Sequence, residues 1–210
     1  GLQALCSNLR LRMSDLAEDD VGFSIGPRIN AASRMEDPVA ALKLLTTKDG
    51  KEAAEIAAHL EKLNASRKGV VSGIVRQAKK IVATRFTPED TVVVIGDTSW
   101  KPSLLGLACN SIMQERGGLV CMWGRDGNGK LKGSCRSDGS VRLSELFDKT
   151  RETFEECGGH DNSGGFTVSH DKVHALRETL QDAAKDIARV LEAKSGWDVR
   201  LTLPEISQEL

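Results

Sequence analysis

Aromatic residues are scarce in this 210-residue chain, where Phe and Trp together make up 4% and tyrosine is absent. A protein that holds nucleic-acid strands by stacking bases needs rings along its binding surface, so this mode of binding is disfavoured. Positive charge is not in excess either, because 29 Lys and Arg stand against 30 Asp and Glu. Any cationic site for an anionic partner must therefore be local.

Long apolar runs and paired cysteines are missing as well. No stretch approaches the roughly 18 apolar residues of a bilayer-spanning helix, and the first residues lack the pattern of a signal peptide. The five cysteines are odd in number, far apart and never spaced as Cys-x-x-Cys, which disfavours a zinc site and a disulfide framework. We therefore expect a soluble, cytoplasmic protein with free thiols, no membrane partner and no metal site of its own. The chain also lacks an initiator Met, as a fragment or a processed product would.

Hydrophobic residues make up 40% of the chain and charged residues 28%, which is typical of one large globular domain or two small ones. The hydrophobic period changes near Pro88. Before it, apolar residues spaced by three or four predict helices over 2–11, 38–45 and 49–84, with an irregular stretch at 21–30. Asp49 followed by Glu52 resembles a capping box at the start of the long helix. We expect a helical connecting segment at 1–87 and an α/β domain at 88–196.

The second domain is predicted to contain a mixed β-sheet with flanking helices. A β-branched strand at 91–96, a helix from Pro102 to about 117 and an apolar strand at 119–123 together predict a parallel crossover. The turn Asp126-Gly127-Asn128-Gly129 predicts a hairpin to a further strand at 130–136. Beyond it we expect, in order, a helix at 141–153, a glycine-rich loop at 158–165, a short strand at 166–169 and a last helix at 171–194.

One motif in the hairpin suggests a phosphate-binding loop. Residues 124–130 fit G-x-x-x-x-G-K, but the next residue is Leu131, where Ser or Thr would hold Mg²⁺. A P-loop must also open a helix, whereas this one opens a strand. We therefore interpret it as a turn.

Two other patterns indicate an anion site, each with a simpler alternative. Strand alternation predicts a cationic stripe with a hydroxyl on one side of the sheet, formed by Lys130, Lys132, Ser134 and Arg136. The alternative is a solvated strand face. His160 lies among glycines, where bare backbone and an imidazole can approach an anion, or it is an ordinary loop histidine.

The remaining histidines and Cys157 are weaker candidates. His59, His170 and His174 are interpreted as solvated helix residues, although His170 and His174 have the spacing of a metal-chelating pair. Cys157 with His160 lacks a third group to orient a thiol nucleophile.

Three separated stretches resemble the RecJ family, single-strand-specific exonucleases of the DHH phosphoesterase superfamily. Residues 26–34 (GPRINAASR), 131–137 (LKGSCRS) and 158–160 (GGH) resemble its GPRINAAGR, LKGSGRS and GGH signatures. Residues 100–106 (WKPSLLG) match its W-H-P-G-V-I-G more loosely. Their order and spacing agree over nearly the whole chain.

The resemblance implies a nuclease of DNA repair and recombination that digests single-stranded DNA from its 5′ end with Mn²⁺ or Mg²⁺. The metals belong to the DHH domain, and no Asp-His-His occurs here. The chain is thus expected to be the DHH-associated part, to bind no cofactor itself, to need a DHH domain in cis or in trans, and to be inactive alone. Residues 197–210 look like the truncated start of the family's OB-like domain.

The resemblance also assigns roles to residues. In the first signature, Arg34, with Arg28 and Asn30, would contact the strand near the interdomain cleft. Arg136 and His160 are the expected catalytic residues, stabilising charge on the phosphate oxygens. The full set expected to bind nucleic acid or its phosphate is Arg28, Asn30, Arg34, Lys132, Ser134, Arg136, Ser137, Gly158, Gly159 and His160.

Two alternatives from other classes stay open. The chain could be a non-catalytic single-strand-binding module, for DNA or RNA. It could also be the substrate-binding half of a DHH-family phosphodiesterase for oligonucleotides or cyclic dinucleotides, since Ser33, Lys101, Ser103 and Ser111 depart from the family pattern. The long helix at 49–84 weighs against this second alternative because it resembles the interdomain helix of RecJ.

Overall fold

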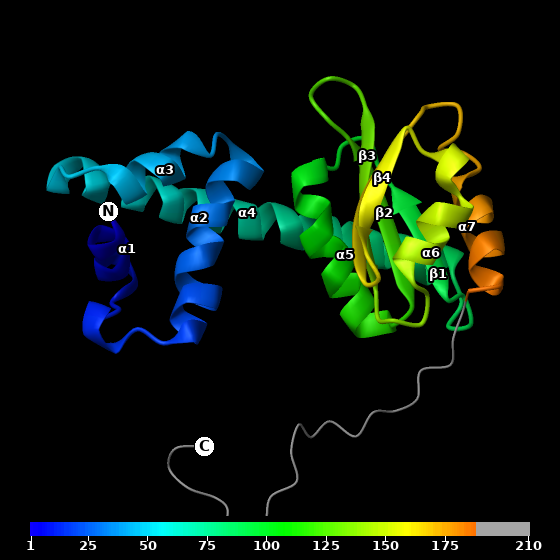
Figure 1. Cartoon of the computed structure of the whole chain (residues 1–210), viewed down its shortest axis with the longest axis horizontal. Helices are drawn as coiled ribbons and strands as arrows, with labels where there is room; N and C mark the ends of the chain where they lie inside the picture. Colours follow the sequence, from blue (N-terminus) through cyan, green and yellow to red (C-terminus); the bar gives the residue numbers. More distant parts are fainter. Residues whose placement is uncertain (188–210) are drawn as a thin grey trace, which may run out of the picture.

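The structure is a computed structural model that describes residues 1–187, and in it two units are joined by one long helix (Figure 1). The first unit is helical and packs against the first half of helix α4. Its elements are α1 (Leu2–Leu9), η1 (Met13–Asp15), η2 (Asp20–Ile25), α2 (Gly26–Met35) and α3 (Val39–Thr46). No helix within the described residues has the length and apolar character needed to cross a lipid bilayer.

Helix α4 (Gly50–Arg85) confirms the predicted long helix and contributes to both cores. In its first half, Ala57 and Leu60 are fully buried against α1, α2 and α3. In its second half, Ile74 and Ala78 are buried in a different cluster, together with residues of the sheet unit. Because one continuous helix supplies apolar side chains to both units, it holds them in a defined relation.

The start of α4 depends on Asp49, whose carboxylate accepts hydrogen bonds from the Lys51 and Glu52 amides at 2.7 and 3.2 Å. Glu52 contacts the Thr47 hydroxyl instead of the Asp49 amide, so the reciprocal half of the predicted capping box is not formed. Asp49→Ala is expected to lower the free energy of unfolding by about 1 kcal/mol in urea denaturation. Lys51→Ala, at an exposed neighbouring position, is the control and should change it by less than about 0.5 kcal/mol. Equal effects of the two variants would contradict a capping role.

The prediction of an irregular stretch at 21–30 is wrong, because these residues form η2 and the first half of α2. Pro27 lies in the first turn of α2, where its fixed φ suits a helix and its missing N–H costs nothing. Ala31 and Ala32 are fully buried against α4. This burial stabilises the helix. The glycines in this stretch favour an irregular segment, and the sequence around them does not show that the alanines are buried.

The sheet of the second unit has five strands in the order β1-β2-β3-β5-β4. Strands β1 and β2 are parallel and joined by helix α5 (Pro102–Arg116), and the other pairs are antiparallel. This confirms the predicted α/β class, the crossover and the hairpin after β2. The strands are β1 (Val92–Gly96), β2 (Leu119–Arg125), β3 (Leu131–Ser137), β4 (Glu156–His160) and β5 (Ser163–Val168).

The two faces of the sheet are covered to different extents. One face is buried along its length against α6 (Leu143–Lys149) and α7 (Leu176–Lys185), with Leu131 and Phe166 in its core. On the other face, α4 and α5 cover β1 and β2, where Val120 and Met122 are fully buried. Over β3, β5 and β4 this second face carries mostly half-buried or exposed residues. We call this area the open half-face.

The predicted glycine-rich loop at 158–165 is instead a hairpin, in which β4 and β5 pair Gly158 with Gly165 and Gly159 with Gly164. A Cβ at Gly159 would lie 2.3 Å from the Ser163 carbonyl oxygen, and one at Gly164 would lie 2.6 Å from the Phe147 ring. These glycines thus allow close packing of strands.

The predicted helices after β3 are shorter than expected. The helix predicted at 141–153 is α6 followed by a 3-10 turn, η3 (Arg151–Thr153). The last helix, α7, starts at Leu176, five residues later than predicted. The rest of that prediction, at 188–194, and the expected OB-like start at 197–210 lie outside the described residues.

Candidate phosphate-binding site

Strand register brings five of the ten predicted ligands onto the open half-face. Arg136 pairs with Ser163, which pairs with His160 on β4, and Ser134 pairs with Gly165, which pairs with Gly158. Lys132 begins a third row with Thr167 and Glu156. Because alternate residues of a strand share one face, these three rows lie side by side, about 7 Å apart. The predicted stripe is thus present on β3, except that Lys130 precedes the strand.

Arg136 is held in place by α5. Its Nη1 donates to the Cys135 carbonyl at 2.7 Å. A Cβ on Gly106 would lie 2.9 Å from Arg136 Nη2. The absence of a side chain at Gly106 therefore makes room for the guanidinium against α5. A guanidinium has five N–H donors, and this hydrogen bond uses one. Arg136 can therefore present a fork of donors to an oxyanion.

Ser137 is not with these residues. It lies on the opposite face of β3, is 3% exposed, and donates to the Val141 carbonyl at 2.6 Å. It also accepts from the Gly139 amide at 3.1 Å, so its hydroxyl holds the turn after β3. Gly159 also lies on the opposite face of the sheet from Gly158 and His160, because successive residues of β4 alternate between the two faces.

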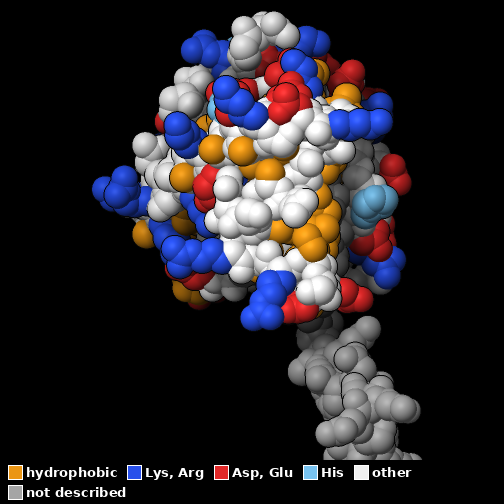
Figure 2. Space-filling view, turned by 90° about the vertical axis from the view of Figure 1, so that its left-hand side faces the viewer, with side chains coloured by type: hydrophobic (Ala, Val, Ile, Leu, Met, Phe, Trp, Pro, Cys, Tyr) orange, Lys and Arg blue, Asp and Glu red, His pale blue; other side chains and the backbone are white. Residues whose placement is uncertain are grey.

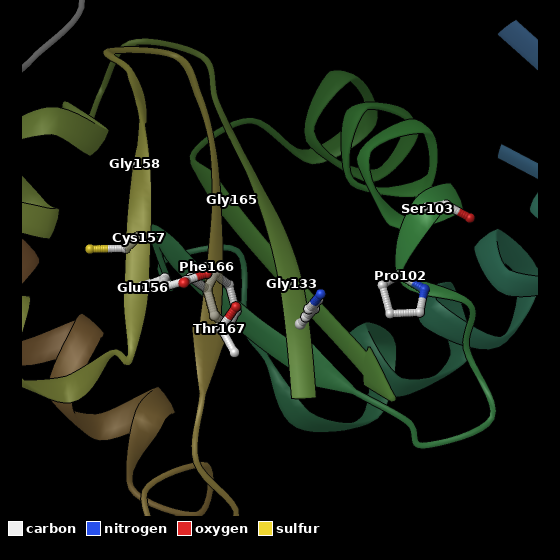
Figure 3. Close-up of a pocket in the computed structure, with 10 residues that line it drawn as sticks. Pro102, Ser103, Gly133, Glu156, Cys157, Gly158, Gly165, Phe166 and Thr167 are labelled. Atoms are coloured by element: carbon white, nitrogen blue, oxygen red, sulfur yellow. The ribbon is translucent and has the colours of Figure 1, made fainter. Parts of the chain in front are cut away.

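A cleft of about 460 Å³ lies between the open half-face and the first turn of α5 (Figure 3). Its walls are Pro102 and Ser103 on the helix side, and Lys132, Gly158 and Gly165 among others on the strand side. The amino end of a helix favours anions through its free amides and its dipole. Lys132 and Glu156 both line the cleft, so it carries one cation and one carboxylate, while Arg136 lies two residues further along β3 from Ser134 and outside the lining.

Lys132 forms an ion pair with Asp126 at 3.1 Å, and its side chain is 45% exposed. Exposed pairs of this kind contribute little, and salt screens them. Desolvation is the largest single influence on the pKa of Asp126 and raises it. Hydrogen bonds from the Lys132 side chain and from the Lys130 and Asn128 amides together outweigh desolvation, so the pKa is lowered. The carboxylate therefore fixes the hairpin turn that the P-loop-like motif encodes.

The Cys157–His160 dyad considered from the sequence does not form. Cys157 points away from the cleft in Figure 3, and its Sγ accepts from Arg151 Nη1 at 3.2 Å. His160 is exposed and lies on the other face of β4.

The other histidines and the buried cysteines do not form a second site in the described residues. His59 Nε2 lies 3.1 Å from Glu36 Oε2, and His170 Nε2 lies 3.0 Å from the Gly129 carbonyl oxygen. His170 and His174 precede α7, so they are not helical neighbours. Burial raises the pKa of Cys109 and Cys135. Within residues 1–187, no three His, Cys, Asp or Glu side chains lie close enough to hold a metal ion, so no step at a metal is assigned to them.

The first signature lies on α2, away from the strand rows but connected to the cleft. Arg34 Nη1 donates to the Ser103 carbonyl at 2.9 Å, and Ser103 Oγ donates to the Arg34 carbonyl at 2.7 Å. Arg28 Nε contacts Glu61 Oε2 at 2.7 Å, and Asn30 is exposed. Arg34 therefore ties α2 to the first turn of α5, at the edge of the cleft.

Sequence reasoning missed Gly106, Glu156 and Thr167 as parts of this site. Gly106 does lie in the loosely matched stretch 100–106, whereas Glu156 and Thr167 are placed by strand register alone.

The family model of the DHHA1 domain matches residues 79–186, which run from the end of α4 through the sheet unit to the end of α7. The chain belongs to the DHHA1 domain family. The resemblance to RecJ is confirmed with it, because this DHHA1 chain is similar to RecJ proteins beyond the matched domain as well.

Among curated proteins, the DHHA1 chain is 31% identical over 168 residues to the single-stranded-DNA-specific exonuclease RecJ of Bacillus subtilis, covering 80% of this chain and 21% of that protein. It is 26% identical over 193 residues to the same-named protein of Haemophilus influenzae, covering 87% and 34%. The crystal structure of RecJ with Mg²⁺ from Thermus thermophilus matches with a TM-score of 0.77 at 26% identity, over 88% of this chain and 28% of that one. The DHHA1 chain thus spans about a fifth to a third of the length of these relatives.

Proposed function

We propose that this chain is the substrate-binding part of a RecJ-like 5′ to 3′ single-stranded-DNA exonuclease, which binds the strand and its scissile phosphate for a two-metal DHH domain. The observation that carries the proposal is the row of Arg136, Ser163 and His160 on the open half-face, with the Arg136 guanidinium against Gly106 of α5. Few aromatic residues are needed for such a site, because its ligands contact phosphate and not bases.

The residues of the row suit the chemistry of phosphodiester cleavage. The Arg136 fork donates two N–H groups to phosphate oxygens, and His160 and the Ser134 hydroxyl donate from either side. As negative charge grows on these oxygens during in-line attack, fixed donors stabilise it more than they stabilise the ground state. Metal ions in the DHH domain would supply the activated water. The chain alone is therefore expected not to hydrolyse DNA.

The helical unit offers a surface for the DHH domain, in cis or in trans. Figure 2 shows hydrophobic side chains on this end of the molecule, among charged residues of both signs. Phe23 is 78% exposed there, and the other large exposed apolar residues of the unit are Met13, Val21, Val39, Leu42 and Leu45. Apolar surface of this kind is typical of a face that another protein part covers.

The test measures anisotropy of a 12-nucleotide DNA strand with a dye at its 3′ end, so that the 5′ phosphate is free. Binding should weaken steeply between about 50 and 200 mM salt, since phosphate contacts release counterions. His160→Ala is expected to weaken binding by about 3- to 10-fold, which corresponds to about 1 kcal/mol, the value of one typical hydrogen bond.

His174→Ala is the matched control, because His174 is exposed and lies outside the cleft. The affinity for RNA of the same sequence shows whether the chain prefers DNA or RNA. A nuclease assay with Mn²⁺ shows whether the chain hydrolyses the strand that it binds. Equal affinity of the wild type and the His160 variant would contradict the proposed site. Hydrolysis by the purified chain would contradict the role of a binding part that depends on a DHH domain.

A further inference from the structure

Three arginines lie close together where α2, α4 and α5 meet. Arg28 and Arg34 come from α2 and Arg67 from the middle of α4. Desolvation lowers the pKa of Arg67, and the charges of Arg34 and Arg28 lower it further. In the part of the chain that the structure describes, the ion pair of this cluster is the one between Arg28 and Glu61. Arg34 and Arg67 donate instead to neutral acceptors, the Ser103 carbonyl and Asn64 Oδ1.

Two buried donors beside this cluster have no hydrogen-bond partner within residues 1–187. They are Nδ2 of Asn64, a fully buried residue, and Nε of Arg67. The two side chains are joined by a hydrogen bond of 2.9 Å from Arg67 Nη2 to Asn64 Oδ1. Leaving a buried donor unsatisfied costs about 1–3 kcal/mol, and more for a charged group. Both donor atoms are shielded from solvent, so an anion would reach this cluster through the part of Arg67 that lines the neighbouring groove.

Arg67 also lines a groove of about 390 Å³ between α4 and α5. Val71, Val75 and Leu107 form apolar walls, and Lys68, Ser72 and Ser111 add a cation and two hydroxyls. No acidic residue among residues 1–187 lines the groove. Leu107 and Ser111 lie about one and two turns along α5 from Ser103, the residue that Arg34 contacts. The groove and the cleft of the open half-face are thus both lined by α5, the cleft at Pro102 and Ser103 and the groove at Leu107 and Ser111.

We propose that the end of this groove at Arg67 is a second anion site, which binds another phosphate of the strand held at Arg136. Arg67 is its central ligand, with Arg34 and Lys68 supplying further charge. The choice of a nucleic-acid strand rests on the function proposed above. The anion site itself rests on the arginine cluster and its free donors.

The test compares Arg67→Gln with Arg76→Gln, which removes the same charge from an exposed position about half a turn round α4. For the 12-nucleotide strand, Arg67→Gln should weaken binding by about 5- to 10-fold and reduce the slope of log affinity against log salt by about 0.7. A 5′-phosphorylated dinucleotide, which fills the Arg136 site alone, should bind both variants as it binds the wild type. Arg76→Gln should leave the 12-nucleotide strand unaffected.

Equal binding of the strand by the two variants would overturn the inference, and so would equal weakening of strand and dinucleotide by Arg67→Gln. If inorganic phosphate raises the Tm of the wild type but not of Arg67→Gln, while strand binding is unchanged, the site takes a free anion and the assignment to the strand is wrong. If Arg136→Ala has no effect while Arg67→Gln does, the function proposed for the open half-face fails and the groove site survives.

Stability provides a separate check. Arg67→Gln removes the hydrogen bond to the fully buried Asn64 Oδ1 as well as one of three like charges, so its Tm is compared only with and without phosphate. Ser111→Asp places a carboxylate in the groove without touching the buried cluster, and it should weaken strand binding while raising the Tm at low salt. Unchanged strand binding by Ser111→Asp would count against the site even if Arg67→Gln folds poorly.

Discussion

An Arg136→Ala variant is expected to bind a single-stranded 12-nucleotide DNA about 10- to 100-fold more weakly than the wild type. The guanidinium fork is fixed by the Cys135 carbonyl and lies against Gly106, so it loses little freedom when it binds an oxyanion. Hydrogen bonds to charged groups contribute about 1.5–3 kcal/mol, which corresponds to this range of affinity. Anisotropy titrations at fixed salt measure the change.

Arg125→Ala is the matched control, because Arg125 is exposed at the end of the neighbouring strand β2 and carries the same charge. It should change affinity by less than about 2-fold, as a distant surface charge does. Arg136→Lys keeps the charge but loses the fork, so it should lie between the wild type and Arg136→Ala. If Arg125→Ala weakens binding as much as Arg136→Ala, then general electrostatics, and not this site, holds the strand.

The elements that the sequence predicts well are those with long, regular patterns. Helix α4 carries apolar residues at helical spacing over 36 residues, and the run of β1 is continuous and β-branched. The turn at Asp126–Gly129 is predicted well because it consists of Asp, Gly and Asn, the residue types that are favoured in turns. In each case local chemistry and tertiary packing favour the same structure.

The errors fall where the side chains give no pattern. Strand β4 and the first half of β5 contain Gly158, Gly159, Gly164 and Gly165, so no alternation of apolar and polar residues marks them as strands. The second half of β5 agrees with the strand predicted at 166–169. Their pairing depends on Phe147 and on the neighbouring backbone, which lie elsewhere in the sequence. Helix α2 was missed for a related reason, since its stability comes from alanines buried against α4.

The candidate site could be predicted in part. Alternation along β3 correctly groups Lys132, Ser134 and Arg136, and the same rule places Ser137 on the other face. The neighbours of these residues could not be predicted, because β5 lies between β3 and β4 and only the register sets His160 in the row of Arg136. The groove at Arg67 needs the approach of α4 and α5, which no local pattern encodes.

Gly133→Ala is expected to destabilise the protein by about 2–3 kcal/mol, although it adds a single methyl group. Gly133 pairs with Phe166 across β3 and β5, and a Cβ at Gly133 would lie 2.1 Å from Phe166 Cζ. The ring is 4% exposed and packs against Phe154 at a centroid distance of 5.2 Å, so it has little room to move. Urea denaturation gives the free energy of unfolding.

A double-mutant cycle with Phe166→Ala tests this cause directly. Phe166→Ala alone should cost about 3–5 kcal/mol through the cavity it leaves. The Gly133 methyl would occupy part of that cavity, so the double variant should be more stable than the sum predicts by at least about 1 kcal/mol. Gly127→Ala, in the hairpin turn with no atom within 4 Å of the added Cβ, is the control and should be nearly neutral. An additive cycle would show that the ring does not limit the space at Gly133.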